Sequence, residues 1–276
     1  RRRLGKMAAP PPPHCVLRGH TAEVTAAHFG QSDGAGQPLL FSAAADGELR
    51  AWSLRTHRSV ASIAAHAGSS VLALHALGTE RLLSQGRDGF MRVWDVHAGL
   101  CGPVLELPVR SYNFCGCAPS LALTAAAATD WEGNGGSEAG ASPHLVAVPD
   151  MDAQLVVLWD LRQQAAQPLR LSAVPGEQPG KGAGMCMSLR FVGEHTVLSG
   201  WEDGSLRLLD SRHARAPLSV RTLHSEPVLC LGAPPDNRAA VSGAADCLVA
   251  VSPLRGGGGG GGGGAGEARG EPGELG

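Results

Sequence analysis

Histidine, serine and aspartate recur at short range in this 276-residue chain, and these three residue types can form the catalytic triad of a hydrolase. In a triad, the histidine takes the proton of the serine hydroxyl while the aspartate orients the imidazole ring. The set recurs in several parts of the chain, however, and no serine in it lies in a GxSxG turn that would expose a nucleophile. The recurrence therefore favours a structural role, and a hydrolase remains the lesser alternative.

The recurrence follows a frame of fixed spacing. A serine is followed after four residues by an aspartate and after six more by a position at the end of a predicted strand. The four copies are Ser42, Asp46, Trp52; Ser84, Asp88, Trp94; Ser199, Asp203, Leu209; and Ser242, Asp246, Ser252. A histidine precedes three of the copies, at His20, His66 and His224. An indole N–H only donates, a carboxylate only accepts and an imidazole can bridge the two, so these side chains can form one buried hydrogen-bonded set.

The elements around this frame are short and strand-like. Runs of β-branched and apolar residues are bounded by Gly, Asp and Pro, and four of them fill each unit of about 40 residues, which is typical of a propeller blade. In the first two units we expect strands at 24–29, 39–43, 48–52 and 59–63, and at 71–74, 81–84, 90–94 and 104–107. The third unit is degenerate: Trp159 closes it, but no serine and aspartate precede it in frame. The fourth unit runs from about 185 to 220 and the fifth from 224 to 252.

Three segments have compositions that do not support a packed core. We expect a disordered Pro-rich start at 1–15, a flexible Ala-, Gly- and Ser-rich insertion with Trp131 at 124–143, and a disordered polyglycine tail at 255–276. The repeats therefore occupy residues 16–254.

Charge and cysteine content narrow the function classes. With 23 Lys and Arg against 25 Asp and Glu, the formal charge of −2 gives no reason to expect direct nucleic-acid binding. Apolar runs are shorter than the roughly 20 residues of a membrane span, so no membrane partner is expected. The seven cysteines form no CxxC pair, and Cys115 with Cys117 would supply only two metal ligands, so we expect free thiols in a reducing compartment, no metal and no cofactor.

The chain resembles the WD-repeat family, in which a His, a Ser or Thr, an Asp and a Trp form a hydrogen-bonded tetrad in each blade. The resemblance rests on LRGHTAEVTAAHF, QPLLFSAAADGELRAWSL, RLLSQGRDGFMRVWD, SGWEDGSLRLLD and HSEPVLCL. It implies two complete tetrads: His20, Ser42, Asp46, Trp52, and His66, Ser84, Asp88, Trp94. It also implies partial sets that contain Trp159, Ser199, Asp203, His224, Ser242 and Asp246.

The resemblance also implies an all-β propeller of seven blades, of which the sequence shows about five. Closure in this family uses an N-terminal strand, here Cys15 to Leu17, that pairs in the last blade. Because the partner strands of that blade are missing, we expect an open arc rather than a closed ring.

Within the family, the chain is similar to the G-protein β-subunit-like group, which includes fungal ASTRA-associated relatives. This implies a non-catalytic adaptor, present in cytoplasm and nucleus, that works with a Tel2–Tti1–Tti2 co-chaperone assembly in maturing phosphatidylinositol 3-kinase-related kinases, with links to chromatin and the DNA-damage response. The alternative is a G-protein β-like signalling subunit. Loop residues beside the repeat aspartates are the candidates for binding protein partners: Glu23, Arg87, Trp201, Glu202 and Glu226.

Overall fold

The computed structural model describes residues 15–30, 38–109, 111, 114–125, 144–152, 154–163, 167–174, 184–234 and 236–254. Of the three segments expected to be disordered or flexible, residues 1–14, 126–143 (with Trp131) and 255–276 lie outside the described residues. At the start of the insertion, Leu121–Ala125 forms the short helix α1. This helix is far too short to span a membrane, and no other helix of the described ranges could span one.

The described strands form five antiparallel sheets, each a meander whose strands follow chain order. Blade 1 consists of β1 (Val24–Gly30), β2 (Leu39–Ala44), β3 (Glu48–Ser53) and β4 (Arg58–Ala64). Blade 2 consists of β5 (Val71–Leu77), β6 (Arg81–Gly86), β7 (Phe90–Asp95) and β8 (Pro103–Pro108). These bounds contain every strand expected in the first two units.

The remaining blades follow the same order. Blade 3 consists of β9 (Ala118–Pro119), β10 (Leu145–Pro149), β11 (Leu155–Asp160) and β12 (Leu169–Ser172). Blade 4 consists of β13 (Cys186–Phe191), β14 (Thr196–Trp201), β15 (Ser205–Asp210) and β16 (Ser219–Thr222). Blade 5 has three described strands, β17 (Val228–Gly232), β18 (Ala239–Ala244) and β19 (Val249–Pro253).

The strand register explains the frame seen in the sequence. In blade 2, Leu82 pairs with Trp94 and Ser84 with Arg92, and in blade 4 Val197 pairs with Leu209 and Ser199 with Arg207. The frame therefore marks the same positions of the second and third strands in blades 1, 2, 4 and 5. A tight turn joins these two strands, and the residue after the aspartate has a positive φ, which glycine adopts without strain, as at Gly47 (φ 84°); in blade 5 Cys247 takes this position (φ 64°).

The core lies between the sheets. Four clusters of buried apolar side chains fill the layers between blades 1 and 2, 2 and 3, 3 and 4, and 4 and 5. Each blade thus buries its faces against its neighbours, as expected for a repeat that cannot bury its own apolar face. The cluster between blades 4 and 5 is the smallest of the four.

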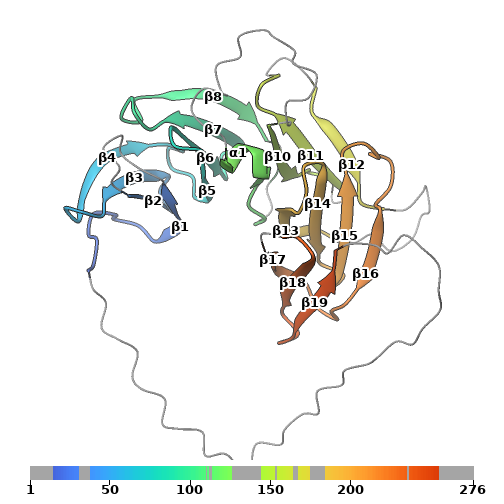
Figure 1. Cartoon of the computed structure of the whole chain (residues 1–276). Coiled ribbons are helices and arrows are strands. Elements are labelled where there is room, and N and C mark those ends of the chain that lie inside the picture. Colours follow the sequence, from blue (N-terminus) through green and yellow to red (C-terminus); the bar gives the residue numbers. More distant parts are fainter. Residues whose placement is uncertain are drawn as a thin grey trace, which may run out of the picture.

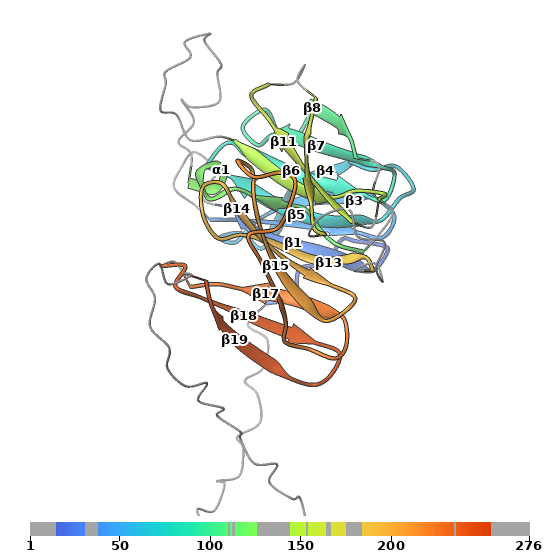
Figure 2. The same ribbon diagram turned by 90° about the vertical axis from the view of Figure 1, so that its right-hand side faces the viewer.

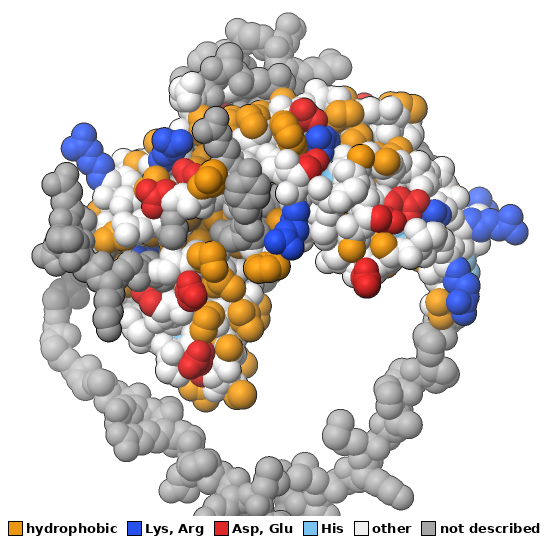
Figure 3. All heavy atoms as spheres, turned by 180° about the vertical axis from the view of Figure 1, so that it is seen from behind, with side chains coloured by type: hydrophobic (Ala, Val, Ile, Leu, Met, Phe, Trp, Pro, Cys, Tyr) orange, Lys and Arg blue, Asp and Glu red, His pale blue; other side chains and the backbone are white. Residues whose placement is uncertain are grey.

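The five blades form an open arc, with blade 1 and blade 5 at its two ends (Figures 1 and 2). Cys15 to Leu17, the segment that would close a ring in this family, have no strand conformation, in agreement with the expected open arc. Hydrophobic side chains gather on blade 5 beside the gap (Figure 3). They include Leu229, Val249 and Val251, and Val249 is 74% exposed.

Candidate functional site

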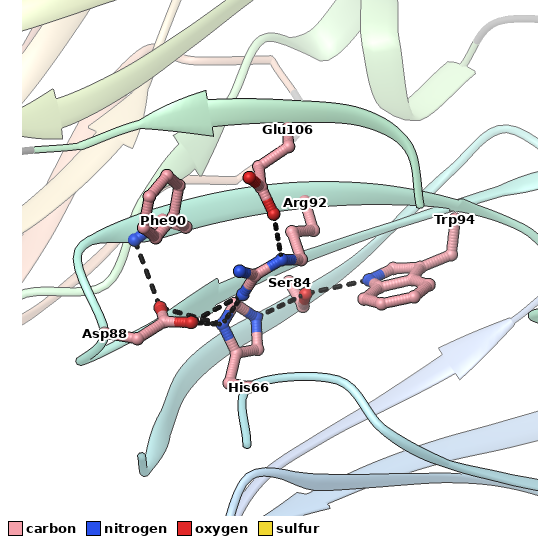
Figure 4. A network of polar contacts seen from close by, with 7 residues as sticks. All are labelled: His66, Ser84, Asp88, Phe90, Arg92, Trp94 and Glu106. Carbon is pink, nitrogen blue, oxygen red and sulfur yellow. Dashed lines mark hydrogen bonds and ion pairs between the residues drawn. The ribbon is translucent and has the colours of Figure 1, made fainter. Parts of the chain in front are cut away.

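The complete tetrad lies in blade 2 (Figure 4). His66 comes from the loop that enters the blade, Ser84 from β6, Asp88 from the turn after β6 and Trp94 from β7. His66 Nε2 lies 2.8 Å from Ser84 Oγ, and Trp94 Nε1 donates to the same oxygen at 2.9 Å. His66 Nδ1 lies 2.9 Å from Asp88 Oδ1. The four side chains expected together are thus placed together.

Arginine adds charge to this network. Arg92 donates through Nη1 to Asp88 Oδ2 at 2.6 Å and through Nε to Glu106 Oε2 at 2.6 Å. Burial lowers the pKa of His66, although the Asp88 carboxylate opposes the shift. Burial alone would raise the pKa of Asp88, but the hydrogen bonds from Arg92 and His66 lower it on balance. The network therefore joins a neutral imidazole to an ionised carboxylate at neutral pH.

A glycine of one blade abuts the histidine that begins the next. His66 donates its backbone N–H to the carbonyl of Gly47 at 3.1 Å, and a Cβ at Gly47 would clash with the carbonyl oxygen of His66. Gly204 and His224 repeat the arrangement, with an N–H to carbonyl distance of 3.2 Å. A side chain at either glycine would push the histidine of the following blade away.

Blade 5 keeps three of the four members. His224 Nε2 lies 2.8 Å from Ser242 Oγ, and His224 Nδ1 lies 3.0 Å from Asp246 Oδ2. The position of Trp94 is taken by Ser252, whose hydroxyl accepts from Arg221 Nη1 at 3.0 Å. Among the described residues, no indole donates to Ser242 Oγ as Trp94 does to Ser84 Oγ.

In blade 1, a glutamate replaces the expected aspartate. His20 Nε2 lies 2.7 Å from Ser42 Oγ, and Trp52 Nε1 donates to Ser42 Oγ at 2.7 Å. His20 Nδ1, however, lies 3.0 Å from Glu48 Oε2, whereas Asp46 caps the turn and accepts from the backbone N–H of Glu48. The expected contact between His20 and Asp46 is corrected, because Glu48 begins the next strand and reaches the ring from there.

Arg50 holds the replacement in place. It lies 2.7 Å from Glu48 Oε1, and its hydrogen bond lowers the pKa of Glu48 to about 2. Ser62 donates to the same carboxylate at 2.6 Å.

Blade 4 rebuilds the set with different residues. Trp201 was a candidate for partner binding, but it is 0% exposed and donates through Nε1 to Ser199 Oγ at 2.8 Å. It thus supplies the indole that Leu209 cannot. Arg207 is buried, contacts Asp203 at 2.7 Å and lies over the Trp201 ring at 5.1 Å, and it provides the charge where no histidine is available.

Blade 3 has no serine at the frame position. The register places Val148 there, and Trp159 pairs with Val146 and is only partly buried. His144 is buried and lies 3.0 Å from Arg162 Nη2, a contact that the sequence reasoning did not anticipate. The degenerate unit therefore folds as a blade without the tetrad.

The hydrogen-bonded sets of the blades have a structural role. The hydroxyl of Ser84 is fully buried and engaged by His66 and Trp94, so no substrate carbonyl could reach it. In the described ranges, no group of three or more His, Cys, Asp or Glu side chains is arranged to hold a metal ion. Cys115 and Cys117 are both buried, and burial raises the pKa of Cys117 to about 12.

One end of the sheets carries the turns between second and third strands. We call this end the turn face and define it by Asp46, Asp88, Asp203 and Asp246. In each of these four turns, one backbone N–H donates to a backbone carbonyl of the loop that enters the same blade. The N–H groups of Ala45, Arg87, Glu202 and Ala245 donate to the carbonyls of Glu23, Ser70, Met185 and Pro227, in that order. The structure therefore brings four of the five binding candidates to one face, all exposed: Glu23, Arg87, Glu202 and Glu226.

Arg87 has a partner that sequence reasoning missed. Its guanidinium lies 4.8 Å from the centroid of the Phe114 ring, and Phe114 is 70% exposed. Within the described ranges, no carboxylate lies at ion-pair distance from Arg87. The pair presents an uncompensated positive charge beside an aromatic ring on the turn face.

Known proteins resemble this chain in sequence, although no family model matches it. Mouse guanine nucleotide-binding protein subunit beta-like protein 1 is 30% identical over 247 residues, which cover 88% of this chain and 69% of the relative. The chain belongs to this family. ASTRA-associated protein 1 is 30% identical in Verticillium alfalfae and 26% in Yarrowia lipolytica, and the chain spans 62% and 58% of those relatives.

Solved structures agree on the fold. The β-propeller domain of Myceliophteria thermophila Cps50 (Swd1) superposes with a TM-score of 0.65 at 17% identity, covering 84% of this chain and 66% of that domain. The computationally designed Ika8 protein superposes with a TM-score of 0.58 at 22% identity, covering 86% of this chain and 60% of that one. The predicted WD-repeat propeller and the predicted relationship are confirmed.

Proposed function

We propose that this chain is a non-catalytic scaffold that binds protein partners through its turn face. The observation that carries the proposal is the exposed stack of Arg87 on Phe114. Arginine and aromatic side chains dominate the binding energy of protein interfaces. The stack also loses little side-chain entropy on binding, because the two groups already order each other.

The partner class that fits this face is a protein with an acidic segment. Arg87 is the one candidate on the turn face that carries a positive charge, whereas Glu23 belongs to blade 1, Glu202 to blade 4 and Glu226 to blade 5. Complementary charge at Arg87 would favour specificity more than affinity.

The finer proposal takes the partner from the relatives. The relatives named ASTRA-associated protein 1 support a role in protein assembly. From the family resemblance we extend this proposal to an assembly of the Tel2–Tti1–Tti2 type, with phosphatidylinositol 3-kinase-related kinases as its clients, in the cytoplasm and nucleus. The name of the mouse relative supports the alternative, a G-protein β-like subunit that binds α and γ subunits.

The test is affinity purification of the tagged full chain from cells, as wild type, Arg87→Glu and Phe114→Ala. Arg58→Glu is the matched control, since Arg58 is exposed at the opposite end of blade 1. Loss of a central interface residue lowers affinity about tenfold or more, so both turn-face variants should lose the co-chaperone subunits while the control retains them. Recovery of G-protein α and γ subunits instead would favour the alternative, and equal recovery by all variants would contradict the use of this face.

A further inference from the structure

A pocket of about 560 Å³ opens between blades 4 and 5, at the end of the sheets opposite the turn face. This volume lies in the range of ligand sites, roughly 300–1,000 Å³. One wall consists of Leu198, Leu206 and Leu208 from β14 and β15, and the other of Leu254 at the end of β19. Arg221 and Ser252 lie at the rim.

The pocket occupies the place that an indole fills elsewhere in the arc. Between blades 1 and 2, Trp94 packs in the same apolar cluster as three residues of blade 1: Leu39, Leu49 and Ala51. The strand register assigns the matching positions of blade 4 to three pocket residues: Thr196, Leu206 and Leu208. The matching position of Trp94 in blade 5 is Ser252, so the walls are present and the ring is not.

The hydroxyl of Ser242 also differs from its equivalents in blades 1 and 2. Ser242 Oγ is fully buried and bonded to His224 Nε2. In blades 1 and 2 the equivalent oxygen accepts a second hydrogen bond, from Trp52 or Trp94. Within the described part of the chain, no indole N–H reaches Ser242. Ser242 itself does not line the pocket, so the pocket is assigned to an indole by Ser252, which does line it and stands at the position of Trp94.

Charge at the rim defines the rest of the occupant. Asp210 is paired with Arg212 at 2.6 Å, and Asp236 is paired with Arg238 at 3.6 Å. Arg221 donates to Ser252, and no carboxylate in the described ranges forms an ion pair with it. The rim therefore carries one positive charge that a carboxylate on the occupant could neutralise.

We propose that this pocket binds a tryptophan side chain of a partner peptide, with an adjacent acidic residue that contacts Arg221. The indole would enter the leucine-lined space from outside, where Trp94 enters the equivalent space from within its own blade. The site lies at the opposite end of the sheets from the turn face, so it goes beyond the scaffold function proposed above and can fail independently of it.

The experiment is a fluorine NMR titration of the full chain with the probe peptide acetyl-Glu-(5-fluoro-Trp)-amide and its Gln analogue. We expect the Glu peptide to bind several times more tightly than the Gln peptide. Arg221→Gln should remove that difference, and Ser252→Trp, which fills the pocket from within, should weaken binding of both peptides at least tenfold. Arg58→Gln, an exposed arginine on blade 1, should change neither.

Folding controls keep the result interpretable. Ser252→Trp should melt no lower than wild type, because its indole would occupy a prepared space, and Leu208→Phe offers a second, smaller change that narrows the pocket. Absence of any fluorine shift at millimolar peptide would overturn the proposal, as would undiminished binding by folded Ser252→Trp. Binding of free indole-3-propionate without binding of the peptide would also overturn it, since the occupant would then be a small aromatic acid.

Discussion

Trp201 donates its indole N–H to Ser199, two residues before it on the same strand, at 2.8 Å. In blades 1 and 2 the equivalent bond comes from the neighbouring strand, ten residues after the serine. Side chains two residues apart on a strand point to the same face, which lets one strand supply both donor and acceptor. Blade 4 therefore keeps the indole-to-hydroxyl bond although the usual tryptophan position holds Leu209.

Trp201→Ala should lower the free energy of unfolding by about 3–5 kcal/mol, because it leaves a large cavity in the layer between blades 3 and 4. Trp201→Phe should cost less, since the ring volume is largely kept and only the N–H donor is lost. Urea unfolding followed by circular dichroism measures both. A Trp201→Ala protein as stable as wild type would contradict the structural role.

Ser84→Ala should destabilise the chain by about 1–3 kcal/mol, because the buried N–H of Trp94 and the imidazole of His66 both lose their shared partner. Ser59→Ala is the control, as its exposed hydroxyl bonds only to the carbonyl of Ala61 and its removal should stay within about 0.5 kcal/mol. The same urea unfolding measurement applies. Equal effects of the two changes would show that the tetrad contributes nothing beyond a surface contact.

Glu48→Gln should destabilise blade 1 more than Asp46→Asn does. Glu48 contacts His20, Arg50 and Ser62, whereas Asp46 accepts only from Thr21 and a backbone N–H. Because Glu48 is partly exposed, solvent screening limits the expected loss to about 1 kcal/mol. Thermal unfolding of the two variants side by side measures the order, and the reverse order would restore Asp46 as the partner of His20.

The stability should fall as the pH drops from about 6.5 toward 4. Burial lowers the pKa of His75 to about 4, with a further contribution from His28, whose ring centroid lies 5.6 Å away. Below about pH 6.5 the unfolded chain therefore protonates this histidine while the folded chain keeps it neutral. The free energy of unfolding falls by up to about 1.4 kcal/mol per pH unit because of this group. Above pH 6.5 His75 is neutral in both the folded and the unfolded chain and no longer changes the free energy of unfolding.

His75→Gln should reduce this slope, since the amide can still donate to the carbonyl of Cys117, 2.9 Å from the imidazole in the wild type. Unfolding by urea at half-unit steps between pH 7 and 4.5 measures it. Glu48 and Asp210, whose pKa values lie at about 2, begin to lose their contributions near their unfolded pKa values, at the lower end of this window, and lose them fully only near pH 2. An unchanged slope in His75→Gln would exclude His75 as the source.

Local spacing predicted the blades but not the substitutions within them. The Ser-to-Asp frame depends on strand register, which the alternation of side chains determines, so Ser84 and Asp88 could be placed from the sequence. The replacement of Asp46 by Glu48 could not, because both carboxylates lie within two residues of the turn and only the position of His20 in space selects between them. The i, i+2 spacing of Ser199 and Trp201 would have indicated the buried role of Trp201, had β14 been expected to extend that far.

Contacts between distant loops were also beyond the sequence. Phe114 lies 27 residues after Arg87, and neither is one of the residues of the repeated frame. Their approach depends on how blade 3 packs against blade 2. The same holds for the pocket at Ser252, because a missing indole becomes a cavity only where the opposite wall stays in place.

The contact of Gly47 with His66, repeated by Gly204 and His224, makes each of these histidines depend on the blade before it. When blade 1 melts, His66 loses the backbone acceptor that orients it, and the tetrad of blade 2 loosens with it. Unfolding of the arc should then spread from blade to neighbouring blade as a nearest-neighbour process. A methyl group at Gly47 would disrupt the contact with His66, so blade 1 should then melt separately from blades 2 to 5.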